Sequence, residues 1–157
     1  MMKIGRKAST TLSLALAVIF LAVLIFSAVI MPWLVNVLVD TRESMGTDAG
    51  IGETEQTLLL VLAYAVIAIA LVADFMLLAL LRNIRRCEVF TSCCVSLIRG
   101  ISWCLIFFGI VFLPIGLYFQ LAFGIAFAGI FMGLCVRVVK NAFEEAVAIK
   151  EENDLTV

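Results

Sequence analysis

Apolar residues gather into four long runs along the chain, and short polar segments separate most of them. The runs cover about residues 12–39, 58–81, 101–118 and 119–136. A bilayer core about 30 Å thick needs roughly 20 apolar helical residues, because backbone amides left unpaired in lipid cost several kcal/mol each. The pattern therefore predicts an all-α fold, an integral membrane four-helix bundle.

Breaks within and between the runs predict details of this bundle. Pro32 lies inside the first run and should bend that helix. Almost nothing separates the last two runs, so we expect Pro114, Gly116 and Gln120 to supply a tight turn between them. No linker composition marks a second unit, and we expect residues 1–157 to form a single membrane domain.

The positions of Lys and Arg predict how the bundle is oriented, since basic loops stay in the cytoplasm. The segment 40–57 holds one basic residue beside five acidic ones and is expected to be an external loop. The other ten basic residues lie before the first run, in the loop 82–100 and in the tail 137–157: Lys3, Arg6, Lys7, Arg82, Arg85, Arg86, Arg99, Arg137, Lys140 and Lys150. Both termini should therefore be cytoplasmic, in a plasma membrane that the chain crosses four times.

Four arginines of the loop 82–100 are candidates for contact with lipid. Anionic headgroups of the inner leaflet attract each juxtamembrane cation by about 1 kcal/mol. The four residues are Arg82, Arg85, Arg86 and Arg99. We expect them to contact headgroups at the inner surface.

Composition excludes much chemistry. The chain is 64% hydrophobic and 15% charged, against about 25% charged in soluble domains, and its net charge of −1 gives no reason to expect direct nucleic-acid binding. It has no His, the commonest metal ligand and proton shuttle. The adjacent Cys93 and Cys94 lack the spacing of a zinc site. We find no nucleophile–base pair or phosphate loop, and expect no enzyme activity, no metal and no cofactor.

Asp74 is the one ionisable residue inside the second run, about eight residues or 12 Å from its inner end. A carboxylate at that depth is costly, and such residues are functional candidates because they can carry protons or coordinate a cation. Alternatively it is structural, a protonated or hydrogen-bonded Asp satisfied by Arg99, Arg137, Ser102 or a backbone carbonyl of a neighbouring helix. The structural interpretation is favoured, since a transporter needs several polar groups converging at the midplane.

The C-terminal tail, residues 137–157, contains strong helix formers and no Pro or Gly, so it predicts a cytoplasmic helical extension. Val136, Val139, Phe143 and Ala146 form a narrow apolar stripe. Such a stripe packs on its own protein or a sister subunit, or docks a different cytoplasmic partner. The candidate partner-binding residues are Phe143, Glu144, Glu145, Val147 and Ile149.

Gly129 and Gly133 form a Gly-x-x-x-Gly pattern in the fourth run, which lets two helix backbones approach closely. Packing within the chain is favoured over contact between copies, so a homo-oligomer is an alternative.

Two segments, LIRGISWCLIFFGIVFLPIGLYFQLAF and RVVKNAFEEAVAIKEENDLTV, resemble the YoaS-like family of small four-span bacterial membrane proteins, a domain of unknown function. The genes of that family often lie beside one for a very small helix-turn-helix transcription regulator. The resemblance implies a membrane partner that binds or sequesters such a regulator.

Three hypotheses follow. The first is a non-enzymatic regulatory membrane protein whose tail binds the cytoplasmic regulator. The second is a small transporter or ion-conducting oligomer that uses Asp74. The third is a structural subunit of a membrane complex, suggested by the glycines of the fourth run.

Overall fold

Four long helices make up the part of the chain that the computed structural model describes, residues 6–44, 52–85 and 91–155. They are α1 (Arg6–Ser44), α2 (Glu53–Arg85), α3 (Ser92–Tyr118) and α4 (Gln120–Leu155). Each is long and apolar enough to cross a membrane. The all-α, multi-pass prediction is confirmed, whereas the expected contact of Arg86 and the central part of the loop 40–57 lie outside the described residues.

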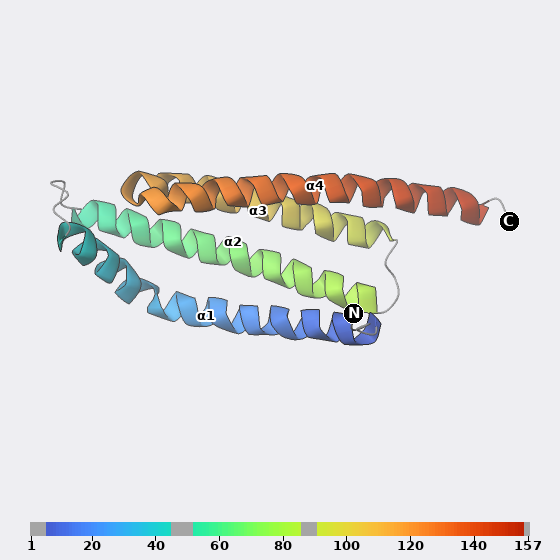
Figure 1. Cartoon of the computed structure of the whole chain (residues 1–157), viewed down its shortest axis with the longest axis horizontal. Coiled ribbons are helices and arrows are strands. Elements are labelled where there is room, and N and C mark those ends of the chain that lie inside the picture. The colour runs from blue at the N-terminus through green and yellow to red at the C-terminus, as the bar shows by residue number, and fades with distance from the viewer. Residues whose placement is uncertain (1–5, 45–51, 86–90, 156–157) are drawn as a thin grey trace, which may run out of the picture.

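The helices pack in the order in which they follow one another along the chain. α3 packs most closely on α4, α2 packs on α3, and α1 packs on α2. Figure 1 shows α1 and α4 on opposite sides of the bundle. Within the described residues, no Cα atom of α1 lies within 8 Å of one in α4. The bundle is therefore a series of neighbouring pairs.

Charged residues distinguish the two ends of this bundle. The start of α1, the end of α2, the start of α3 and the C-terminal half of α4 lie together at one end (Figure 1). We call it the basic end, because it carries Arg82, Arg85, Arg99, Lys140 and Lys150. The opposite, acidic end carries Asp40, Glu53 and Glu55.

The large apolar side chains of α1 face outward to an unusual degree. Leu16, Phe26 and Val29 are each more than half exposed, and Val29 reaches 75%. Pro32 lies inside this helix, which is bent in its second half (Figure 1). Since no soluble domain leaves so much apolar surface in water, lipid is the environment that fits it.

The turn between α3 and α4 is shorter than the sequence predicts. Pro114 and Gly116, expected in the turn, lie inside α3, and Gln120 already begins α4. Only Phe119 separates the helices, and its backbone N–H donates to the carbonyl of Ile115 at 2.9 Å. The expectation was wrong because membrane helices tolerate proline where neighbouring helices and local adjustments satisfy the freed carbonyl.

Small residues line the contact between α3 and α4. On α3, three buried small residues recur every seven positions; on α4, four recur at spacings of four, three and four. They are Ser102, Gly109 and Gly116, and Ala122, Ala126, Gly129 and Gly133. We call this contact the small-residue seam. Its members lie on one face of each helix, which is the arrangement that close packing in lipid requires.

The seam brings the two backbones into direct contact. A Cβ atom added to Gly109 would lie 2.6 Å from the carbonyl oxygen of Ala126, and one added to Gly133 would lie 3.0 Å from that of Ser102. Gly129 likewise faces Gly109 across the seam. The glycines of α4 are thus engaged inside the chain.

This geometry predicts opposite effects for two glycine substitutions. Gly109→Ala should lower the free energy of unfolding by about 1–3 kcal/mol, because backbone atoms of α4 cannot move aside. Gly124→Ala is the matched control, since nothing lies within 4 Å of its added Cβ, and it should leave stability equal or up to about 1 kcal/mol higher. Unfolding titrations in mixed micelles measure both. Equal effects of the two substitutions would contradict the seam.

Candidate functional site

Asp74 of α2 is the buried charged residue of the described chain. It is 3% exposed and lies eleven residues before Arg85, about 16 Å along the helix from that end. Neither of its carboxylate oxygens has a hydrogen-bond partner among the described residues. An unpaired buried polar group costs about 1–3 kcal/mol, and more when it is charged. Asp74 therefore lowers the stability of the fold, which makes it a candidate for a functional role.

Ser102, the neutral side chain expected to satisfy Asp74, is used elsewhere. Its hydroxyl donates to the backbone carbonyl of Gly133 across the small-residue seam, at 2.9 Å. Ser102 is itself 2% exposed, so this bond is shielded from any competing solvent. The hydroxyl stabilises α3 against α4 instead of reaching α2.

The two arginines expected to pair with Asp74 also interact with other residues. Arg99 Nη2 lies 3.0 Å from Glu144 Oε1, and the Arg137 guanidinium lies 5.0 Å from the ring centroid of Trp103. Both interactions join or lie along α3 and α4. The prediction that Ser102, Arg99 or Arg137 satisfies Asp74 is therefore wrong, because each of these side chains interacts with a residue of α3 or α4 instead.

Asp74 borders a cavity of about 440 Å³ at the centre of the bundle. All four helices contribute to its wall, and apart from Asp74 the lining is apolar, with the Cys104 thiol and the Met132 thioether its other heteroatom-bearing side chains. Representative lining residues are Phe20 of α1, Ala73 of α2, Cys104 and Phe108 of α3, and Ala128 and Met132 of α4. The carboxylate is thus a single charge on a hydrophobic wall.

A second cavity, of about 600 Å³, lies between α1 and α2 and shares Phe20, Asp74 and Leu77 with the first. Ser13 and Leu16 of α1 and Leu81 of α2 line its part nearer the basic end, while Phe20 and Asp74 border both cavities. Asp74 consequently lines both a space at the bundle centre and one that extends toward the basic end.

The chemistry open to this site is narrow. Calcium takes six to eight oxygen ligands, and magnesium demands an octahedral set, whereas Asp74 offers one carboxylate among apolar groups. No group of three potential metal-ligating side chains occurs within the described residues. Apart from the Cys104 thiol, the residues that line the cavity with Asp74 offer no acid, base or nucleophile, so the carboxyl group is suited to binding a positive charge or a proton.

A second polar cluster lies at the basic end, where α4 has passed its apolar segment. Glu144 pairs with Arg99 of α3 and with Lys140 one turn earlier on α4. The hydrogen bond from Lys140, together with the positive charges of Lys140 and Arg99, lowers the pKa of Glu144 below its ordinary value. The carboxylate therefore stays ionised at neutral pH and joins α4 to α3.

The candidate partner-binding residues of the tail fall into two groups. Val147 is 8% exposed and lies beside Val95 of α3, and Phe143 is half-buried. Glu145 and Ile149, in contrast, are exposed. Three of the five candidates, Phe143, Glu144 and Val147, thus contact the chain itself.

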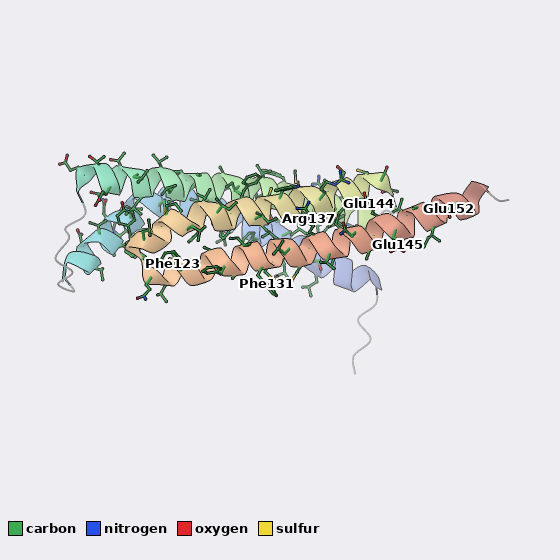
Figure 2. The ribbon with its side chains drawn as sticks, turned by 90° about the horizontal axis from the view of Figure 1, so that it is seen from above. Phe123, Phe131, Arg137, Glu144, Glu145 and Glu152 are labelled. Atoms are coloured by element: carbon green, nitrogen blue, oxygen red, sulfur yellow. The ribbon has the colours of Figure 1, made fainter. Side chains whose placement is uncertain are left out.

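The candidate headgroup contacts that the structure describes are all exposed at the basic end. Arg82 and Arg85 occupy the last turn of α2, and Arg99 lies two turns into α3. Arg137, Glu144, Glu145 and Glu152 follow one another along α4 toward its C-terminus (Figure 2). Basic and acidic groups are therefore interspersed on this surface.

Sequence reasoning missed Gly109 and the cavity residues Phe20 and Cys104. The seven-residue spacing of Ser102, Gly109 and Gly116 is a signal that could have revealed the seam. No pattern in the sequence points to Phe20 or Cys104, because their place in the cavity depends on how four helices meet.

One comparison with known proteins gives a match. The family described as "Protein of unknown function (DUF2975)" matches residues 7–157. No curated protein and no protein of solved structure shows significant similarity to the chain. The predicted membership in a family of unknown function is confirmed, and the match extends over all four helices.

An unpaired Asp74 predicts that its removal stabilises the protein. Asp74→Leu should raise the free energy of unfolding by about 1–3 kcal/mol, because it removes a buried carboxylate without a partner. Ser102→Ala is the matched control, since it removes a buried group that has a partner, and it should lower stability by about 1 kcal/mol. Denaturant titration in mixed micelles measures both variants. Destabilisation by Asp74→Leu would show that the carboxylate has a partner in the protein.

Proposed function

This chain belongs to the DUF2975 family, whose function is unknown, and we propose that it is a non-enzymatic regulatory protein of the plasma membrane. In this proposal it binds or sequesters a small cytoplasmic helix-turn-helix transcription regulator. The basic end faces the cytoplasm, with the N-terminus and the C-terminal extension on that side. The gathering of arginines and lysines at one end of the bundle supports this orientation.

The projection of α4 beyond the other helices is the observation that carries the proposal. α4 has 36 residues, about 54 Å, and Figure 1 shows its C-terminal part extending past the start of α3. This exceeds a hydrocarbon core of about 30 Å, so the projecting part lies outside the lipid. A helix held at one end and exposed at the other is well placed to contact a soluble partner.

The side chains of the projection define the proposed contact. Phe143 and Val147 pack on the chain's own helices and serve as its anchor, so Glu145 and Ile149 remain of the expected partner face, and we add the exposed Glu152 further along the same helix. Figure 2 shows Glu145 and Glu152 along this part of α4. DNA-binding proteins carry basic surfaces, which an acidic helix with one exposed apolar side chain complements.

Two changes to the projection test this proposal by pull-down of a small helix-turn-helix regulator of the kind that the resemblance implies. A chain ending at Ala148 and the double variant Glu145→Lys, Ile149→Asp should each recover at least tenfold less regulator than wild type. Both keep the residues that pack on α3, so the membrane bundle stays intact.

Glu55→Lys is the control, because it reverses an exposed charge at the acidic end. It should recover the regulator as wild type does. If the chain ending at Ala148 recovers as much regulator as the full chain, the tail is not the binding site and the proposal fails.

A second function, a small transporter or ion-conducting oligomer, is favoured by the place of Asp74 on the walls of two cavities. A carboxylate that borders one space at the bundle centre and another toward the basic end can pass a proton or cation between them. The third hypothesis, a structural subunit, was suggested by the glycines of the fourth run. Gly129 and Gly133 pack against α3 of the same chain, so they do not support it.

Flux into liposomes tests the second function. Proteoliposomes with wild-type protein should take up protons or a monovalent cation at least tenfold faster than those with Asp74→Asn. Glu55→Gln removes a carboxylate from the same helix outside the cavities and should behave as wild type. Equal leak from wild type and Asp74→Asn across the ion panel would exclude this function.

A further inference from the structure

We infer that the central cavity beside Asp74 is a binding site for a hydrophobic organic cation, an apolar body that carries one positive centre. This inference names a ligand class for the site of the second proposal above. It requires binding alone, so it holds or fails separately from any flux and from the contact of the tail with a regulator.

The charge of the ligand follows from the isolation of Asp74. Its two oxygens are buried without a hydrogen-bond partner among the described residues, and Asp74 is one of the residues that line the cavity. Arg99 and Arg137, which the sequence led us to expect beside Asp74, instead contact Glu144 and Trp103 respectively. A positive ligand supplies the missing partner, whereas an anion would add a second unpaired charge in an apolar space.

The apolar body of the ligand follows from the remaining wall. The cavity volume of about 440 Å³ falls within the roughly 300–1,000 Å³ of small-molecule sites, which are mostly apolar with a few placed polar groups. Phe108, Met132 and Ile125 offer aromatic, thioether and aliphatic surface. An inorganic cation would have to leave its water for a single carboxylate, so an organic cation fits this wall better.

The route to the site follows from the way α1 packs. Among the described helices, only α2 has Cα atoms within 8 Å of those of α1, and the cavity between these two helices extends from Asp74 toward Ser13 and Leu81. The basic end faces the inner leaflet in the proposed orientation, where anionic headgroups concentrate cations. A hydrophobic cation can therefore enter from that leaflet between α1 and α2.

Equilibrium binding of radiolabelled tetraphenylphosphonium to the full chain in nanodiscs tests the inference. Wild type should bind it saturably, with one site per chain above the uptake of empty nanodiscs. Asp74→Asn should weaken this binding at least tenfold, because it removes the counter-charge and little volume. Glu55→Gln, at an exposed position of the same helix, should bind as wild type does.

Two further arms separate the cavity from a general effect of charge or fold. Ala128→Phe places a large side chain on the cavity wall while keeping Asp74, and it should also weaken binding at least tenfold. Radiolabelled tetraphenylborate, which has nearly the same shape and the opposite charge, is measured in a separate titration and should show no saturable binding above the uptake of empty nanodiscs. Gel filtration and thermal unfolding establish whether each variant is folded. If Asp74→Asn does not fold, the measurements with Ala128→Phe and with tetraphenylborate decide the question.

Three results would overturn the inference. They are uptake no greater than that of empty nanodiscs, equal affinity of wild type and Asp74→Asn, and saturable binding of tetraphenylborate with an affinity equal to that of the cation. Saturable binding without cation flux would support the inference and exclude transport.

Discussion

The close approach of α3 and α4 is the constraint on which the rest of the structure depends. Lipid gives helices no hydrophobic reason to associate, so contact must come from packing and interhelical hydrogen bonds. Gly109, Gly133 and their neighbours remove the side chains that would hold the backbones apart, and Ser102 adds a hydrogen bond across the gap. The ion pair of Arg99 with Glu144 continues the contact beyond the apolar segment.

Asp74 is isolated as a consequence of that contact. Each polar side chain of α3 and α4 that could have reached it is held within the seam or its extension. α2 and α1 add to this rigid pair one at a time, and the spaces left between them are the cavities that Asp74 lines. A tight pair and a looser one thus produce a buried charge in an apolar pocket.

The extent to which the sequence predicted this structure differs between the helices and the site. Four apolar runs determine four membrane helices because lipid tolerates few other structures, and that prediction held. The turn at Phe119 was missed, since Pro114 and Gly116 were weighed by their behaviour in soluble proteins. The sequence identified Asp74 as unusual, but the partners predicted for it were wrong. Hydropathy and spacing do not say which helix face Ser102 or Arg99 occupies.

The same limit applies to the tail. Its apolar stripe was recognised, and both self-packing and partner docking remained open. Val147 is buried against α3, whereas Ile149 is exposed where α4 projects past that helix. The two residues lie about 200° apart around α4, so the helical period places them on different faces, but it does not say that α3 is the helix that covers the face of Val147.

A double-mutant cycle between Asp74 and Arg99 tests the isolation of the carboxylate most directly. Unfolding free energies of wild type, Asp74→Ala, Arg99→Ala and the double variant give the coupling energy between the two side chains, and the same cycle applies to Arg137 and Ser102. An unpartnered Asp74 predicts a coupling below about 0.5 kcal/mol in every cycle, the value found for residues that share no contact. A coupling of about 1 kcal/mol or more with any of the three would place Asp74 in an internal ion pair or hydrogen bond, and would contradict its assignment as a ligand site.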